Sequence, residues 1–191
     1  IEVLTGFKYI GEQIKFFEQQ HTYHYVFGLE ESYGCLAGTY ARDKDACVAV
    51  MMLCEVASWC KKHGKTLWDA MLDMYEKYGY YAEKTHNLVM PGLDGLRDMA
   101  ELMRKLKDEP PTEIAGTEVV VRKDYNDGTV HDCRTGAVTK MELSGSNVLR
   151  YELEDGTVIL VRPSGTEPKI KVYILTQGAD AAASNANLEK Y

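Results

Sequence analysis

Apolar positions in the first 80 residues recur mostly at helical spacing. Between residues 6 and 20 they fall every three or four positions and so mark one face of a helix: Phe7, Ile10, Ile14 and Phe17. Residues 43–63 are apolar on nearly all sides, which predicts a largely buried helix that ends at Gly64. Thr66, with Asp69 three residues later, predicts the cap of a third helix that ends at Gly79. Short strands are expected at residues 24–27 and 80–84.

The remainder of the chain shows a different pattern, with one helix and several strands. Residues 94–107 predict a helix that Pro110 and Pro111 stop. Apolar and polar residues then alternate in the strand pattern at 118–123, 147–153, 157–161 and 169–176. The sequence Glu154-Asp155-Gly156 predicts a hairpin turn between two of these strands. This part is therefore expected to be α+β with a mainly antiparallel sheet, after a domain boundary between residues 80 and 91.

The segment between the last two strands, Arg162-Pro163-Ser164-Gly165-Thr166-Glu167-Pro168, suits a phosphate-like anion. Its prolines prevent it from continuing the strand, whereas a guanidinium fork, two hydroxyls and a glycine N–H can all contact one tetrahedral anion. Lys169 and Lys171 place two more cations on one face beside it. A plain turn with a solvated Arg162 explains the spacing about equally well.

Two polar stretches in the first half are weaker candidates for binding. Glu30, Glu31 and Ser32 lie between Gly28 and Gly34 and could contact sugar hydroxyls, although a solvated polar turn accounts for them more simply. Arg42-Asp43-Lys44-Asp45 precedes the long helix, where one of its aspartates would act as the cap. The two cations of this stretch oppose the helix dipole, a small cost that a phosphate-bearing ligand would offset.

Composition excludes several classes of function. A formal charge of −7 and a pI near 5.3 argue against nucleic-acid binding, because a phosphate backbone needs a broad basic face. The five cysteines show no paired ligand spacing and suit reduced thiols, and the five histidines form no zinc-binding pair on a helix. No apolar run is long enough for a bilayer. We therefore expect a cytoplasmic protein with no metal site, nucleic-acid partner or membrane partner. Because the chain starts at Ile1 without an initiator methionine, we expect it to be a piece of a longer polypeptide.

Four stretches form a pattern when they are taken together: Thr5-Gly6-Phe7-Lys8, residues 28–34, residues 42–45 and residues 162–168. In order and spacing they resemble the C-terminal half of the α-D-phosphohexomutases, most of all the phosphoglucomutase/phosphomannomutase family. The resemblance implies an α/β three-layer, sugar-recognition domain at residues 1–84, which is most of the family's third domain. It implies an α+β, phosphate-binding fourth domain at residues 85–191, with a mainly antiparallel sheet and helices on one face.

The resemblance also implies a reaction and a set of roles. Members of this isomerase class interconvert hexose 1-phosphate and hexose 6-phosphate through a phosphoserine, with Mg²⁺ as cofactor and hexose 1,6-bisphosphate as intermediate and activator. The resemblance makes a hexose phosphate the ligand and the N-terminal domains of the same polypeptide the partners. It implies sugar contacts from Lys8, Glu30 and Ser32, charge stabilisation or proton delivery from Lys44, and phosphate contacts from Arg162, Ser164, Gly165, Thr166 and Lys169.

Departures from the family pattern limit this reading. The 191 residues contain neither the family's Ser-His-Asn-Pro nucleophile loop nor its Asp-Gly-Asp-x-Asp-Arg metal loop, so we expect this chain alone to bind substrate without turnover. Glu31-Ser32-Tyr33-Gly34 replaces the Ser-Gly-His ending of the glucosamine relatives and favours glucose or mannose phosphates, with a pentose phosphate left open. The alternative is a stand-alone sugar-phosphate-binding or interaction module without catalysis. Nucleotide binding ranks lower because no base pocket is evident.

Overall fold

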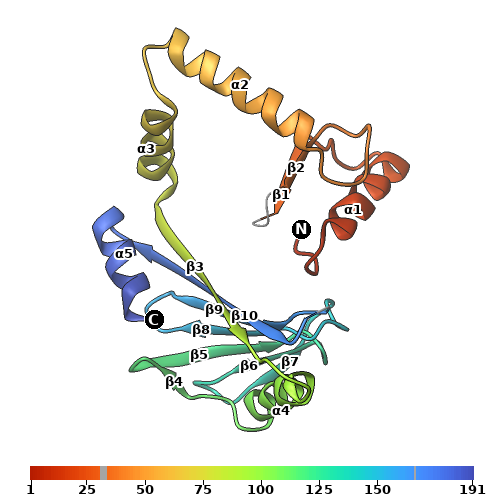
Figure 1. Cartoon of the computed structure of the whole chain (residues 1–191), viewed down its shortest axis with the longest axis vertical. Helices are drawn as coiled ribbons and strands as arrows, with labels where there is room; N and C mark the ends of the chain where they lie inside the picture. Colours follow the sequence, from red (N-terminus) through yellow and green to blue (C-terminus); the bar gives the residue numbers. More distant parts are fainter. Residues whose placement is uncertain (31–33, 166) are drawn as a thin grey trace. The chain divides into compact units, whose positions relative to one another are not determined.

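The computed structural model describes residues 1–30, 34–165 and 167–191. These residues form two compact units, which we call the N-terminal unit (Ile1–Asp73) and the C-terminal unit (Met74–Tyr191). The helices and strands of each unit are labelled in Figure 1. The domain boundary that the sequence places near residue 84 stays a prediction.

The N-terminal unit has a small core at the junction of a helix and a hairpin. The amphipathic face expected for residues 6–20 is present in α1, where Phe7 and Ile14 are buried against Leu36 of β2. Strands β1 and β2 pair antiparallel, and Glu30 pairs with Gly34 at one end of the ladder. The elements of this unit are α1 (Phe7–Gln20), β1 (Phe27–Glu30), β2 (Gly34–Ala37) and α2 (Ala46–Lys62).

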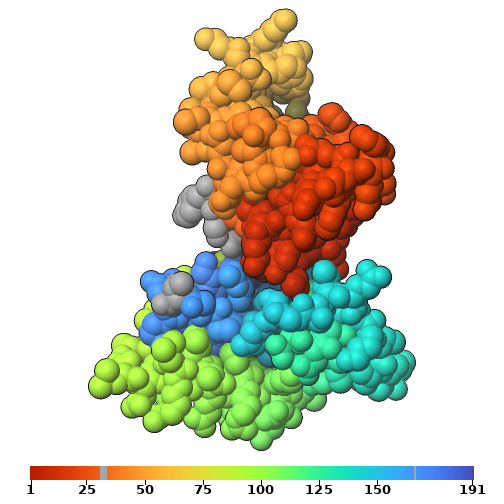
Figure 2. All heavy atoms as spheres, turned by 90° about the vertical axis from the view of Figure 1, so that its right-hand side faces the viewer, coloured from red at the N-terminus to blue at the C-terminus, as the bar shows by residue number. Residues whose placement is uncertain are grey.

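Helix α2 corrects the expectation of a largely buried helix at residues 43–63. Of its residues only Cys60 is buried, whereas Leu53 is 58% and Trp59 is 56% exposed. The side chains of α2 are accordingly in view on the surface in Figure 2, in orange. The reason is geometric: a 17-residue helix is about 26 Å long, whereas a four-residue strand covers about 13 Å. The described hairpin is too short to cover the apolar surface of the helix.

Both helix caps expected before α2 and α3 (Leu67–Tyr78) are confirmed. The Asp45 carboxylate accepts hydrogen bonds from the N–H groups of Cys47 and Val48, as an N-cap residue does. The Thr66 hydroxyl accepts a bond from the N–H of Asp69, and the Asp69 carboxylate accepts one from the N–H of Thr66. This reciprocal pair satisfies two N–H groups that the first helical turn leaves free.

The C-terminal unit is built on an antiparallel sheet of eight strands in the described residues. Its strand order is β3-β10-β9-β8-β5-β6-β7, with β4 paired to β5. The expected hairpin at residues 154–156 joins β8 to β9. The elements are β3 (Tyr80–Val89), α4 (Gly95–Asp108), β4 (Glu113–Ile114), β5 (Thr117–Asp124), β6 (Thr129–Asp132), β7 (Val138–Lys140), β8 (Leu149–Leu153), β9 (Val158–Pro163), β10 (Lys169–Gly178) and α5 (Ala181–Lys190).

The helices of this unit cover one face of the sheet and leave the other uncovered. Because side chains alternate along a strand, the apolar residues of β8, β9 and β10 reach a single core: Leu149, Tyr151, Leu153, Ile159, Val161, Ile170 and Ile174. Met99, Leu102 and Met103 of α4 and Leu188 of α5 pack against it. The expected fold class, α/β followed by α+β with helices on one face of the sheet, is confirmed (Figure 1).

Several strands differ from the pattern-based expectation. A strand was expected at residues 24–27, but β1 spans Phe27–Glu30, and β2 and β4 were not expected. Residues 80–84 were expected to form a short strand, but β3 continues to Val89 and pairs along its whole length with β10. The sequence pattern does not predict β6 or β7, because none of their residues is buried. A strand without a buried face needs no apolar alternation, so the pattern carries little signal for it.

Truncation of the core should cost far more than truncation on the open face. We expect Ile170→Ala to lower the free energy of unfolding of the C-terminal unit by about 2–5 kcal/mol, because Ile170 is fully buried and its loss leaves a cavity. Leu175→Ala, on the same strand but 36% exposed, serves as the control and should cost much less. Urea unfolding followed by the amide NMR signals of this unit measures both losses, and equal losses would contradict the assigned core.

Candidate functional site

In the N-terminal unit the Lys44 ammonium joins two carboxylates. Its Nζ lies 3.2 Å from Oε2 of Glu30 and 2.9 Å from Oδ1 of Asp43. The same ammonium lies 5.0 Å from the centre of the Phe7 ring, within the range of a cation–π contact. The Glu30 side chain is 19% exposed, so one partner of the ammonium is largely shielded from water while the other, Asp43, is open to solvent.

The backbone around Lys44 is fixed to the hairpin. The Asp45 N–H donates to the Cys35 carbonyl at 2.9 Å, which ties the start of α2 to β2. The Tyr40 hydroxyl donates to the Asp45 carboxylate at 2.5 Å, and this bond raises the pKa of Tyr40 to about 12. Lys44 is therefore held next to Glu30 by its neighbours as well as by its own charge.

The charges at this site shift the pKa values in opposite directions. The hydrogen bond to Asp43, followed by the interaction with Glu30, raises the pKa of Lys44 above its ordinary value. The same hydrogen bond lowers the pKa of Asp43. Lys44 is thus protonated at neutral pH, and its ammonium is an electrostatic group with no tendency to lose a proton there.

The other sugar-site candidates of this unit are placed differently. Lys8 lies in the first turn of α1 with its ammonium 4.8 Å from the centre of the Tyr9 ring. Ser32, which the resemblance assigns to sugar binding, lies outside the described residues. The sugar-contact roles of Lys8, Glu30 and Ser32 stay predictions.

In the C-terminal unit Arg162 and Lys171 face each other across β9 and β10. Cross-strand partners point to the same side of a sheet, here the side that the helices leave open. Neither side chain forms an ion pair within residues 1–30, 34–165 and 167–191. Like charges directly opposite each other destabilise a sheet, and an anion bound between them would remove that repulsion.

The loop that follows Arg162 is closed by its own hydrogen bonds. The Ser164 N–H donates to the Lys169 carbonyl at 2.8 Å, and the Glu167 N–H donates to the Ser164 hydroxyl at 3.3 Å. Gly165 is exposed, and a Cβ at this position would have no atom within 4 Å. The Gly165 backbone is therefore open to a ligand, while Thr166 lies outside the described residues.

The two lysines of β10 have different partners. Lys169, which the resemblance assigns to the phosphate, forms an ion pair with Glu167, and this contact is the main cause of the lowered pKa of Glu167. Lys171, which was not assigned to the site, faces Arg162 directly. The alternation of the two lysines with apolar residues indicates their common face, but only the register of the pairing shows that Lys171 lies opposite Arg162.

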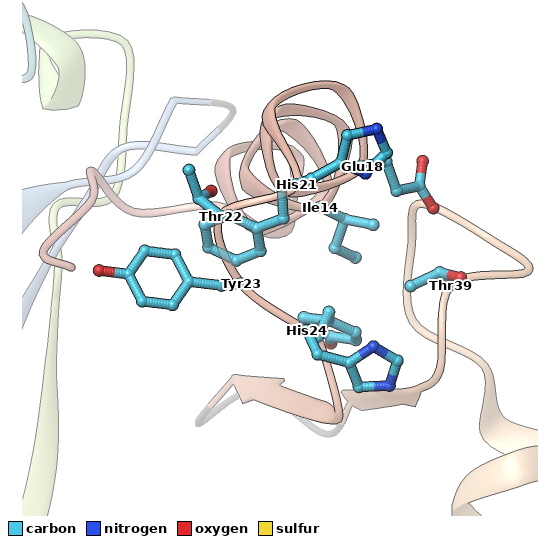
Figure 3. Close-up of a pocket in the computed structure, with 9 residues that line it drawn as sticks. Ile14, Glu18, His21, Thr22, Tyr23, His24 and Thr39 are labelled. Carbon is cyan, nitrogen blue, oxygen red and sulfur yellow. The ribbon is translucent and has the colours of Figure 1, made fainter.

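A separate pocket of about 660 Å³ lies beside the carboxyl end of α1 (Figure 3). Aromatic and imidazole side chains dominate its lining, and Phe17 and Tyr23 meet edge to face at 5.3 Å. Glu18 at its rim pairs with Arg42 at 2.5 Å. The predicted site residues are absent from its lining, so this pocket is distinct from the groups described above.

No group of three or more His, Cys, Asp or Glu side chains in residues 1–30, 34–165 and 167–191 could hold a metal ion. Within the same part of the chain, every helix is too short or too polar to cross a membrane.

Fold and site together define a two-unit α/β plus α+β protein with an anion-compatible loop between strands β9 and β10 of its antiparallel sheet. Residues 1–78 match the family model "Phosphoglucomutase/phosphomannomutase, alpha/beta/alpha domain III", and residues 87–187 match the model of the C-terminal domain of the same family. The chain belongs to the phosphoglucomutase/phosphomannomutase family, as the sequence motifs predicted.

Individual relatives agree with this assignment. The chain is 37% identical over 173 residues to a phosphoglucomutase of Staphylococcus aureus (strain bovine RF122) and 36% identical to one of Staphylococcus epidermidis (strain RP62A). Each match covers 91% of this chain but 31% of the relative, so the chain spans about a third of the relatives' length.

A solved structure shares the fold. It is the open form of an exocytosis-sensitive phosphoprotein, pp63/parafusin (phosphoglucomutase), from Paramecium, with a TM-score of 0.57 and 18% sequence identity. The match covers 97% of this chain and 31% of that protein.

The two carboxylates beside Lys44 should contribute unequally to its pKa. We expect Asp43→Asn to lower the pKa of Lys44 further than Glu30→Gln does, because the hydrogen bond to Asp43 is the largest cause of the rise. Both changes lower the value, since each removes an anion that stabilises the protonated ammonium. An NMR pH titration of the Lys44 side chain measures the two values. Lys65, whose raised pKa depends on Asp73, is the internal control and should not respond.

Proposed function

We propose that this chain is the substrate-binding part of a phosphohexomutase that interconverts hexose 1-phosphate and hexose 6-phosphate. The observation that carries the proposal is the pair of facing cations, Arg162 and Lys171. Neither forms an ion pair within the described residues, although Glu167 is close enough to Lys171 for a longer-range attraction. Family membership makes a sugar phosphate the chemically matching anion.

The C-terminal unit would hold the phosphate group. Arg162 supplies a planar fork of N–H donors, which suits phosphate oxygens better than a point charge does. Lys171 adds a second positive charge from the opposite strand, and the Ser164 hydroxyl and the Gly165 N–H supply neutral donors from the loop. Thr166 is proposed as a further donor from the sequence resemblance alone. Lys169 would contribute more weakly, because Glu167 neutralises it.

The N-terminal unit would contact the sugar. The Glu30 carboxylate can accept hydrogen bonds from hydroxyls, and its ion pair with Lys44 holds it in place. We propose Ser32 and Lys8 as additional contacts. We assign Lys44 to charge stabilisation rather than to proton delivery, since its raised pKa opposes loss of the proton near neutral pH.

Turnover would need groups that the 191 residues do not supply. We propose that a phosphoserine and Mg²⁺ come from the preceding domains of a longer polypeptide, that hexose 1,6-bisphosphate is the intermediate, and that the reaction takes place in the cytoplasm. The five free cysteines are consistent with a reducing compartment.

Binding of a sugar phosphate is the direct test. Titration with glucose 1-phosphate should shift the amide NMR signal of Gly165, and Arg162→Ala should weaken the response by about tenfold or more in Kd, because a hydrogen bond to a charged group contributes about 1.5–3 kcal/mol. Arg104→Ala is the matched control, because Arg104 is an exposed arginine paired with Asp108. An unchanged spectrum of the parent chain would contradict the proposal.

Inorganic phosphate separates the two parts of the proposed site. It should shift the Gly165 amide but not that of Gly34, whereas glucose 1-phosphate should shift both if the sugar reaches the N-terminal unit. Shifts at Gly165 alone with both ligands would support an anion site and contradict the sugar contacts.

The chain by itself should show no mutase activity. We expect no conversion of glucose 1-phosphate to glucose 6-phosphate by the purified 191 residues, even with Mg²⁺ and glucose 1,6-bisphosphate, because the nucleophile and metal loops that the family resemblance implies are not in this sequence. A coupled assay for glucose 6-phosphate measures this. Turnover by the purified chain would overturn the assignment of the chemistry to residues outside it.

A further inference from the structure

The side chain of Lys44 lies across the space above Gly34. A Cβ built on Gly34 would be 2.7 Å from Cγ and 3.0 Å from Cβ of Lys44, and it would be closer still to Cδ. These atoms are the stem of the lysine and not its mobile end, so the stem cannot move aside without carrying the ammonium with it. The stem occupies the space that a side chain at position 34 would fill.

The backbone conformation at position 34 does not require a glycine. Gly34 is a strand residue of β2, and it is not among the glycines with a positive φ in the described residues, so an L-amino acid could adopt its backbone conformation. It pairs with Glu30 across the hairpin, which places position 34 and the Glu30 side chain on the same face. The contact with Lys44 is therefore the physical reason for a residue without a Cβ.

The ammonium of Lys44 is located by contacts from several sides. Glu30 lies 3.2 Å away, Asp43 lies 2.9 Å away, and the buried ring of Phe7 lies 5.0 Å away. Asp43 is adjacent to Lys44 in sequence and can follow it, but Glu30 and Phe7 belong to β1 and α1. The path over Gly34 brings the stem to these two fixed partners.

We infer that Gly34 is a positioning residue: the absence of a side chain there lets Lys44 lie across the hairpin and hold its charge beside Glu30. The consequence for substrate binding rests on the proposed function, whereas the positioning itself does not. Any side chain at position 34 displaces the lysine from Glu30 and leaves Asp43 as its remaining carboxylate partner.

The first test is the pKa of Lys44 in Gly34→Ala. The value should fall by about as much as in Glu30→Gln, because both changes remove the same carboxylate from the ammonium. Gly165→Ala is the matched control: it adds the same methyl group where no atom lies within 4 Å, also at a glycine without positive φ, and should leave the pKa of Lys44 unchanged. An unchanged value in Gly34→Ala would overturn the inference.

A double-mutant cycle covers the case in which Gly34→Ala does not fold. Lys44→Ala removes Cγ and Cδ, so Gly34→Ala should lower the urea midpoint less in the Lys44→Ala background than in the parent chain. Equal losses, or failure to fold in both backgrounds, would contradict the positioning role. A chain that shows the Lys44 effects but binds no glucose 1-phosphate would contradict the proposed function and leave the positioning role supported.

Discussion

The antiparallel pairing of β9 with β10 is the constraint on which the C-terminal unit depends. One register places Ile170 and Ile174 in the core and, on the opposite face, sets Arg162 against Lys171. A shift by one residue would expose the isoleucines, and burial of each contributes about 1.5–3 kcal/mol. Repulsion between facing like charges costs less, on the order of 0.2–1 kcal/mol. Core packing therefore fixes the register, and the two facing cations are a consequence that the fold tolerates.

A comparable constraint operates in the N-terminal unit on a smaller scale. Its core is small, so the hairpin and the start of α2 are held together largely by polar contacts, among them the bond from the Asp45 N–H to the Cys35 carbonyl. The position of the Lys44 side chain follows from this connection, because the Lys44 backbone is fixed beside β2 and its aliphatic stem crosses the hairpin. In each unit, a charged group is located by backbone pairing more than by its own ion pair.

Sequence reasoning succeeds where a local rule decides the structure. The alternation in residues 169–176 and the caps at Asp45 and Thr66 depend on neighbours within a few positions, and all are present. It fails where contacts between residues far apart in the chain determine the structure. The apolar pattern of α2 predicts burial, but it does not show whether another element packs against the helix. Arg162 and Lys171 face each other because of the register between β9 and β10, and neither segment determines that register by itself.

An acidic chain can present an anion site because local pairing matters more than net charge. On the open face of the sheet, Lys123 and Arg150 both lie within 3.2 Å of Glu152, and Lys169 pairs with Glu167. In the part of the chain that the structure describes, Arg162 and Lys171 form no ion pair, and Lys171 is attracted to Glu167 only at longer range. At an ionic strength of 0.15 M, charges more than about 8 Å apart are largely screened, so the total of −7 has little influence at this point. The position of the carboxylates thus determines which cations remain available to a ligand.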